Sequence, residues 1–341
     1  MKEGPVEMLQ GIYKLEVPFL PGVGEENLSS TLCYLVRDGD GWLMVDCGFN
    51  EEHAFNAFRQ QLDVLGIPVK DIRWLFVTHY HPDHSGLAAR IKAVSGARVI
   101  IHQDDWNVLK ATVSSVEIWN IHGLVEWAKP FGVPPPDLAT FQERATFGRA
   151  FFPRGLEPDI ILQGKENMVG EEGRLRAILT PGHTPGHICL YDEQNRVLFS
   201  GDHVLVGITP HISPSHLTSY NQLGQYLDAL RKVQCLDVDL VLPAHERPFG
   251  YLARRVDEIL EHHRNRLDEM VAALSGCPLN PWDLAMRVHW DVGTWDQMDA
   301  INRMLAMRET LAHLELLESR GQVYLVAKGG LNLYKLTDAS A

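Results

Sequence analysis

The sequence lacks several features that mark particular classes of protein. Its 341 residues contain no run of about 18 consecutive apolar residues, the length that a transmembrane helix needs. The N-terminal segment has neither the basic region nor the apolar region of a secretory signal, so we expect a cytoplasmic location. The five cysteines are never spaced C-x-x-C, which argues against a disulfide framework and against a thiolate zinc knuckle.

Positive charge is also scarce. The 31 Lys and Arg residues stand against 44 Asp and Glu residues, which gives a formal net charge of -13. Because non-specific affinity for nucleic acids comes mainly from basic side chains, we expect no nucleic-acid partner. Hydrophobic residues make up 45% of the chain and charged residues 22%, which is typical of a globular protein with a substantial core.

Short apolar runs alternate with amphipathic helical patterns over the first 250 residues. The patterns predict strands at 31–36, 42–46, 74–78, 97–102, 174–180, 187–191, 197–200 and 239–242, with helices at 51–65, 85–94 and 220–233. This order predicts an α/β domain over residues 1–250 that has two sheets sandwiched between helical layers.

A long segment rich in aromatic residues interrupts the alternation. We interpret residues 104–160, approximately, as a mainly helical insertion that is split by three consecutive prolines. The aromatic side chains, Trp106 among them, have two interpretations. They form an extra packing layer over the core, or they belong to a lid that lines an apolar substrate pocket.

The pattern changes after Gly250. Three helical patterns are followed by a hairpin pattern, at 251–274, 278–288, 300–319, 322–327 and 331–336. Three helices followed by a hairpin is the layout of a winged helix. The sequence therefore predicts a second, α+β domain over residues 251–341.

Sixteen histidines are many for this length, and their placement is informative. The stretch T-H-Y-H-P-D-H-S-G places His79, His81, Asp83 and His84 between a predicted strand and a predicted helix. Nitrogen and oxygen ligands without sulfur suit Zn, Fe or Mn. The stretch therefore predicts a metal site.

Three further residues of the same kind also follow predicted strands. His183 lies in P-G-H-T-P-G-H, Asp202 in S-G-D-H and His245 in L-P-A-H-E. Strands of one layer deliver the loops at their C-terminal ends to one edge, so we expect these side chains to converge there. Seven ligands divide into two metal sites bridged by a carboxylate and a water, with the metals about 3.5–4 Å apart.

Together with V-D-C-G at residues 45–48, these motifs resemble the metallo-β-lactamase-fold superfamily over about residues 31–250. The resemblance implies a four-layer αββα sandwich and a dinuclear centre. In that centre the first metal is bound by His79, His81 and His183, the second by Asp83, His84 and His245, and both by Asp202. This ligand set is similar to that of glyoxalase II and of RNA-processing members. The zinc β-lactamases have a cysteine in the place of Asp202, so β-lactam hydrolysis is disfavoured.

Four more residues have expected roles near the site. The resemblance implies that Asp46 is a carboxylate that orients a ligating histidine, the alternative being a plain turn residue. His203, His216 and Trp106 are candidate substrate contacts. For His203 a hydrogen-bonded structural role is the alternative.

The predicted chemistry is hydrolysis by a hydroxide bound to two metals. Zn²⁺ lowers the pKa of a bound water from about 15.7 to about 7, so hydroxide is available at neutral pH. Asp83 is the expected catalytic proton relay. We expect two divalent ions, Zn²⁺ first with Fe or Mn as alternatives, and a small acyl substrate that is a thioester, an ester or a lactone.

The sequence features are also compatible with two other activities and with one structural role. The winged-helix layout resembles the C-terminal module of a lactamase-like endoribonuclease branch, which would make the chain a single-strand endoribonuclease or phosphodiesterase. Residues 254–341 hold 10 basic and 13 acidic side chains, and this balance disfavours RNA. A mononuclear iron dioxygenase of the same fold is a second alternative. The insertion or the C-terminal domain could also form a homodimer interface, and we expect no membrane partner.

Overall fold

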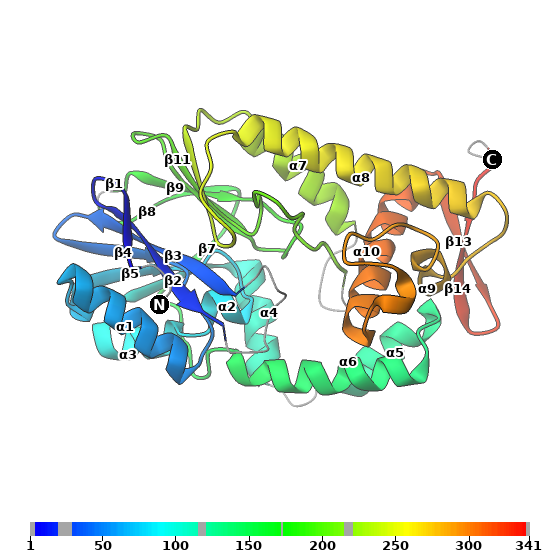
Figure 1. Cartoon of the computed structure of the whole chain (residues 1–341), viewed down its shortest axis with the longest axis horizontal. Coiled ribbons are helices and arrows are strands. Elements are labelled where there is room, and N and C mark those ends of the chain that lie inside the picture. The colour runs from blue at the N-terminus through cyan, green and yellow to red at the C-terminus, as the bar shows by residue number, and fades with distance from the viewer. Residues whose placement is uncertain (1–3, 20–28, 115–120, 172, 215–220, 339–341) are drawn as a thin grey trace. The chain divides into compact units, whose positions relative to one another are not determined.

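Two mixed β-sheets, whose central strands are buried on both faces, are present in the computed structural model of the chain (Figure 1). The structure describes residues 4–19, 29–114, 121–171, 173–214 and 221–338. These residues form two compact units, each assembled from three segments of the chain. The first comprises Met1–Ser114, Gly148–Pro210 and Lys232–Arg255, and the second comprises Ser115–Phe147, His211–Arg231 and Val256–Ala341.

The first unit contains both sheets. The larger sheet has the order β1-β2-β3-β4-β5-β6-β7, with the strands Val6–Leu9, Ile12–Pro18, Ser30–Asp38, Gly41–Val45, Ile72–Phe76, Arg98–His102 and Ile160–Leu162. Its pairs are antiparallel up to β4 and parallel from β4 to β7. The smaller sheet has the order β12-β11-β10-β9-β8, with the strands Leu240–Pro243, Val197–Gly201, Ile188–Asp192, Leu175–Leu179 and Glu166–Val169. In this sheet β11 and β12 are parallel and the other pairs are antiparallel.

Two hydrophobic clusters use the two faces of the larger sheet. One cluster joins it to the smaller sheet, where the rings of Tyr34 and Phe199 pack edge to face with centroids 5.5 Å apart. The other cluster joins its opposite face to helices and includes Phe58 and Leu109. A strand that is buried on both faces appears in the sequence as a continuous apolar run. For this reason β3 and β4 could be predicted from the sequence.

The helices of the first unit are amphipathic or short. They are α1 (Glu52–Leu65), α2 (Pro82–Ser85), α3 (Ala88–Ser95) and α4 (Gln103–Ser114), with short 3₁₀ turns at Val69–Asp71 and Arg149–Phe151. Phe55, Phe58 and Leu62 form the buried face of α1, which ends at Gly66 in the left-handed conformation with φ 66°. Figure 1 shows α1 and α3 beside the strands of the larger sheet. The predicted helices at 51–65 and 85–94 are therefore confirmed, with shifts of a few residues at the start of the second.

Four strands were not predicted from the sequence. In β2, Lys14 and Glu16 break the apolar pattern and pair with each other at 3.0 Å. The strands β1, β7 and β8 have only four, three and four residues, and each has exposed positions. Short strands with few buried side chains carry little periodic signal, so they become visible only when they pair with a neighbour.

The second unit is mainly helical and ends in a hairpin. Its elements include α5 (Ile121–Ala128), α6 (Pro135–Gly148), α9 (Pro281–Ala285), α10 (Ala300–Ser319), β13 (Val323–Lys328) and β14 (Leu331–Leu336), with 3₁₀ turns at Lys129–Phe131 and Trp295–Gln297. Parts of α7 (Gln222–Gln234) and α8 (Leu252–Leu274) also belong to it. Leu279 and Tyr334 exchange two backbone hydrogen bonds, which fasten the hairpin to the segment before α9.

The helices and the hairpin expected after residue 250 are therefore present. The segment expected to be a helical insertion contains α4, α5 and α6. The winged-helix likeness and the division into domains 1–250 and 251–341 stay predictions. Among the helices of the described ranges, none is both long enough and apolar enough to cross a bilayer.

Candidate metal centre

The seven predicted ligands follow strands of both sheets, five of them on loops and two, Asp83 and His84, in the short helix α2. His79, His81, Asp83 and His84 follow β5, and His183 follows β9. Asp202 follows β11 directly and His245 lies two residues after β12. The structure brings all seven together at one edge of the first unit.

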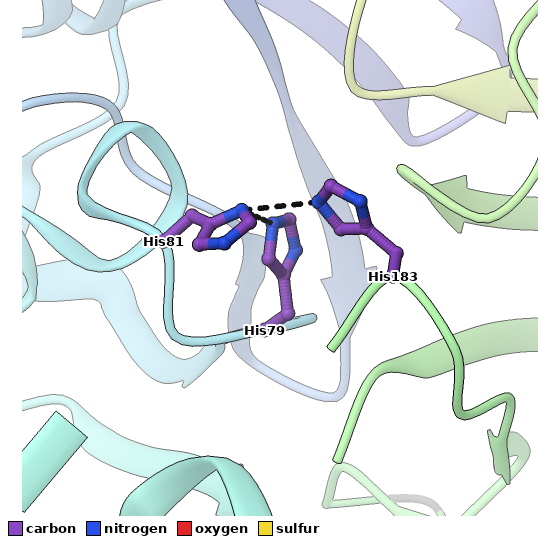
Figure 2. A group of neighbouring side chains, drawn as sticks. All are labelled: His79, His81 and His183. Carbon is purple, nitrogen blue, oxygen red and sulfur yellow. Dashed lines mark hydrogen bonds between the residues drawn. The ribbon is translucent and has the colours of Figure 1, made fainter. Parts of the chain in front are cut away.

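Three histidines form the first group (Figure 2). The Nδ1 atom of His81 lies 3.0 Å from Nε2 of His79 and 3.0 Å from Nε2 of His183. In a tetrahedral zinc site with Zn–N bonds of about 2.0–2.1 Å, two ligand nitrogens are about 3.3 Å apart. The three nitrogens therefore surround a point at a spacing that suits one small divalent cation.

A chain of hydrogen bonds sets the tautomer of His79. The Thr78 hydroxyl donates to Oδ2 of Asp46 at 2.8 Å, and the same hydroxyl lies 3.0 Å from Nδ1 of His79. Because the hydroxyl proton is used toward Asp46, the hydroxyl oxygen accepts from His79, which places the ring proton on Nδ1. The Nε2 atom then presents a lone pair to the first group.

The second group contains Asp83, His84 and His245. Oδ2 of Asp83 lies 3.2 Å from Nε2 of His84 and 3.3 Å from Nε2 of His245. His84 donates from Nδ1 to Oδ2 of Asp46 at 2.8 Å, and His245 donates from Nδ1 to the Ser30 carbonyl at 3.1 Å. These bonds leave both Nε2 atoms available as ligands.

Asp202 lies between the two groups. Its Oδ2 atom is 3.5 Å from Nε2 of His183 and 3.4 Å from Nε2 of His84, and its Oδ1 atom is 3.4 Å from Nε2 of His245. Within the described residues, Nε2 of His84 and Oδ1 of Asp202 are buried and make no hydrogen bond. Buried polar atoms without a hydrogen bond are costly, and a shared cation would satisfy both. The residues present therefore fit a dinuclear centre bridged by a carboxylate.

The electrostatics differ between the groups. Burial, together with neighbouring histidines, lowers the pKa of His81 to about 3 and holds that of His79 well below its usual value. Burial also opposes the charged form of His245, but Asp202 and Asp83 outweigh it and raise the pKa to about 10. The carboxylates raise the pKa of His84 in the same way, against burial. The first group thus holds neutral imidazoles, and the second attracts protons that a cation can replace.

His187 has a place in the site that sequence reasoning missed. It is the second histidine of P-G-H-T-P-G-H and is fully buried. Its Nδ1 atom lies 2.9 Å from the Thr180 hydroxyl, and its Nε2 atom accepts a hydrogen bond from the backbone amide of Asp202 at 3.1 Å. His187 therefore holds the backbone of Asp202, and the repeated P-G-H was the signal available in the sequence.

The structure places two of the three candidate substrate contacts. His203 is fully buried, with its ring centroid 5.9 Å from that of His187. Trp106 packs in the same hydrophobic cluster as Phe152. Substrate contact by either side chain stays a prediction, and His216 lies outside the described residues.

A row of aromatic rings adjoins the second group. Phe151 packs against Phe49 with ring centroids 5.4 Å apart, Phe49 against Phe19 at 4.9 Å, and Phe19 against the ring of His245 at 5.9 Å. Phe19 and Phe49 are half-buried. Phe151 comes from the segment expected to be an aromatic insertion, so one aromatic ring of that segment is connected through this row to His245.

The family model described as the metallo-beta-lactamase superfamily matches residues 27–245, a range that contains all seven clustered side chains. The chain belongs to the metallo-beta-lactamase superfamily. Members of this superfamily bind divalent metals, in agreement with the histidine and aspartate groups of this chain.

Two curated proteins are similar to this chain over most of its length. A Bacillus subtilis protein named YqjP and described as a probable metallo-hydrolase is 23% identical over 338 residues, which are 96% of this chain and 98% of the relative. The lactamase-like protein adaB of Aspergillus niger is 25% identical over 252 residues, 74% of this chain and 61% of the relative.

Solved structures share the fold of this chain. A metallo-beta-lactamase family protein from Thermus thermophilus matches with a TM-score of 0.80 and 26% identity, covering 97% of this chain and all (100%) of that one. A beta-lactamase domain protein from Burkholderia ambifaria matches with a TM-score of 0.77 and 24% identity, covering 98% and 95%. A subclass B3 metallo-beta-lactamase of Bradyrhizobium japonicum is 18% identical, with a TM-score of 0.53 over 80% of this chain and 97% of that one.

Proposed function

We propose that this member of the superfamily is a dinuclear metallo-hydrolase that acts on a thioester, an ester or a lactone of a small molecule. The observation that carries the proposal is the pair of ligand groups that share Asp202, with lone pairs directed inward by outer hydrogen bonds. Two divalent cations bound there would polarise a substrate carbonyl and lower the pKa of a water. Zn²⁺ suits the ligands, and Fe or Mn are the alternatives.

Asp83 is the residue that we assign to proton transfer. A hydrolase must take a proton from the attacking water and deliver one to the leaving group. The Asp83 side chain is 17% exposed against 11% for Asp202, and its Oδ2 atom lies 3.2 Å from Nε2 of His84 and 3.3 Å from Nε2 of His245. Asp83 is therefore the more exposed of the two clustered carboxylates and lies beside two histidines of the site.

The aromatic row supports an acyl or aryl substrate. Phe19 and Phe49 offer half-buried apolar surface beside His245. A substrate with an apolar acyl group gains about 25 cal/mol for each Å² of apolar surface that it removes from water there. The formal net charge of the chain, -13, disfavours a polyanionic substrate because like charges repel.

The test is a panel of acyl thioesters, aryl esters, lactones and one simple phosphodiester. We expect turnover of acyl substrates that disappears when a chelator removes the metals and returns when Zn²⁺ is added. His84→Ala should reduce kcat/KM by about 1,000-fold or more, because the second group loses a ligand. His289→Ala is the matched control, since this histidine side chain is 75% exposed and lies in the second unit.

Two results would contradict the acyl-hydrolase proposal. Absence of metal-dependent turnover on every acyl substrate would contradict the proposal, and turnover of the phosphodiester alone would favour the phosphodiesterase alternative.

Metal analysis distinguishes the proposed hydrolase from a mononuclear iron dioxygenase. The group of Asp83, His84 and His245 supports two metals per chain, whereas a single iron per chain would favour the dioxygenase.

A further inference from the structure

Asp105 contacts both of the loops that carry the first histidine group. It is fully buried in the first turn of α4. Its Oδ2 atom accepts hydrogen bonds from the Tyr80 amide at 2.8 Å and from the Thr184 hydroxyl at 2.7 Å. Its Oδ1 atom accepts one from the Gly186 amide at 2.6 Å. One carboxylate therefore receives three donors from two loops that are about 100 residues apart in the chain.

These donors adjoin the metal ligands. Tyr80 separates His79 from His81, and Thr184 directly follows His183. The 3.0 Å separation between Nδ1 of His81 and Nε2 of His183 spans the same two loops. Any change in the spacing between the loops therefore changes the spacing of the ligand nitrogens.

The loop of His183 approaches Asp105 closely because residue 186 is a glycine. A Cβ atom at Gly186 would lie 2.5 Å from the backbone nitrogen of Asp105, a distance that no side chain tolerates. The negative charge is favoured at this end of α4 by the helix dipole and by three charge-assisted hydrogen bonds. Burial works against the charge and raises the pKa of Asp105 to about 7, with the three donors opposing it.

A backbone hydrogen bond joins the same two segments at another place. The Ile188 amide donates to the Thr78 carbonyl at 2.9 Å, at the ends of the strands. That bond lies before His79 in one segment and after His183 in the other. It leaves the ligand-bearing parts of both loops to be held by other groups, and Asp105 contacts both of those parts.

We propose that Asp105 is a positioning residue for the first metal, which holds the loop of His79 and His81 and the loop of His183 at the separation where their three nitrogens meet. This inference rests on the proposed metal-dependent function. Removing an outer partner that orients metal ligands typically weakens metal affinity about 10–100-fold, and we expect an effect of this size.

The first test uses the isosteric variant Asp105→Asn in the full chain. Whichever way the new amide is oriented, its NH₂ group faces at least one of the three donors. Metal-free protein is titrated with Co²⁺ alone, with affinity read by competition against a chromophoric chelator and geometry read by visible absorption. We expect Co²⁺ binding at the first site to weaken about 10–100-fold, with a changed spectrum.

Asp104→Asn is the matched control. Asp104 lies in the same helical turn, and its side chain is 53% exposed. The substitution removes the same charge from the same end of α4 but touches neither loop. We expect its Co²⁺ affinity and spectrum to equal those of the unaltered protein.

A second pair of variants tests one of these hydrogen bonds from the donor residue, Thr184. Thr184→Val removes the hydroxyl that donates to Asp105 at nearly constant shape, and Thr184→Ser retains it. We expect weaker Co²⁺ binding in the valine variant and recovery in the serine variant. In the double variant, Asp105→Asn with Thr184→Val, the loss of Co²⁺ affinity should be smaller than the product of the two single-variant losses. The reason is that both substitutions disrupt the same hydrogen bond.

The outcomes separate this inference from the proposed function. If the unaltered protein binds no Co²⁺, the proposed function is wrong. If it binds and both Asp105→Asn and Thr184→Val bind equally well, the positioning role of Asp105 is wrong. An equal fall in Tm of the metal-free and metal-loaded forms, with unchanged affinity, would also overturn it and leave a purely structural role. If Asp105→Asn does not fold, the Thr184 pair decides.

Discussion

Asp46 links both ligand groups through three hydrogen bonds. It accepts from the Thr78 amide and hydroxyl and from Nδ1 of His84, each at 2.8 Å. Its backbone has φ 57°, in the left-handed region that costs most residues about 1–2 kcal/mol. A residue held in such a conformation persists because the surrounding contacts over-determine it. The sequence prediction that Asp46 orients a ligating histidine therefore has a specific geometry to be tested.

We expect Asp46→Asn to weaken metal binding about 10–100-fold. The amide keeps the size of the carboxylate but turns an NH₂ group toward at least one of the three donors. Chelator competition on the full chain measures the affinity. Asp40→Asn, in the exposed turn between β3 and β4, should bind metal as the unaltered protein does. Equal affinities for Asp46→Asn and Asp40→Asn would contradict the role of Asp46.

The protonation of His245 predicts how metal-induced stabilisation depends on pH. Its pKa rises from 6.5 to about 10 on folding because Asp202 and Asp83 outweigh burial. This contribution to the stability of the metal-free protein is complete below pH 6.5 and is lost as the pH rises toward 10. Metal binding displaces the same proton, so affinity increases over the same range.

The difference in Tm between the metal-loaded and metal-free forms should therefore increase from about pH 6.5 to about pH 9. Differential scanning calorimetry of both forms across this window measures it. Calorimetric titrations in buffers of different ionisation enthalpy should also report release of protons on binding at about pH 7. A Tm difference that is constant or falls with pH would contradict this reading of the second group.

At the scale of elements, the loop after Asp202 is held from two sides. Glu246 accepts hydrogen bonds from the amides of Gly207 at 2.9 Å and Ile208 at 3.4 Å. Arg255 donates to the carbonyls of Leu205 at 2.7 Å and Ile208 at 2.8 Å. Glu246 itself has φ 66°, in the left-handed region that favours glycine, so its backbone is strained while its side chain holds the loop.

Two substitutions at Glu246 distinguish the contribution of its hydrogen bonds to stability from the cost of its strained backbone. Glu246→Ala and Glu246→Gly both remove the carboxylate, but only glycine relieves the left-handed conformation. We expect the glycine variant to be about 1 kcal/mol more stable than the alanine variant in urea unfolding. Both should weaken the metal affinity of the centre by a similar factor. Equal stability of the two variants would contradict the strain at this position.

At the same scale, the strands that precede the predicted ligands were predicted, whereas the short strands β1, β7 and β8 at sheet edges were not. β5, β9, β11 and β12 are apolar runs followed by a motif, so both their position and the placement of the ligands at their C-terminal ends could be predicted. β7 and β8 acquire their strand conformation from pairing with β6 and β9. Such pairing is a contact between distant segments, which a local pattern does not contain.

At the scale of the whole molecule, the second unit is assembled from three segments of the chain. Residues 115–147 and 211–231 belong to the same unit as residues 256–341. Asn221 donates from its amide to Glu315 at 3.0 Å, and Gly132 packs so closely on Asn280 that a Cβ atom would lie 2.5 Å from its side chain. The middle segments thus depend on residues near the C-terminus.

A chain that ends at Gly250 should therefore be less stable than the full chain. It retains α5 and α6 but lacks α9, α10 and the hairpin, which leaves apolar surface of the middle segments exposed. We expect a lower Tm by thermal denaturation, increased binding of a hydrophobic dye and aggregation in light scattering. A monodisperse truncated chain with the Tm of the full chain would contradict this dependence.

The sequence alone determined the chemistry of the centre. Histidine and aspartate motifs directly after apolar runs specify which groups converge and which metals they suit, because a strand delivers the loop that follows it to a known edge. Tertiary structure alone decided which buried residues hold those groups in place. Asp105, His187 and Glu246 act through bonds to residues 15 to 81 positions away, and only folding brings such partners within 3.5 Å.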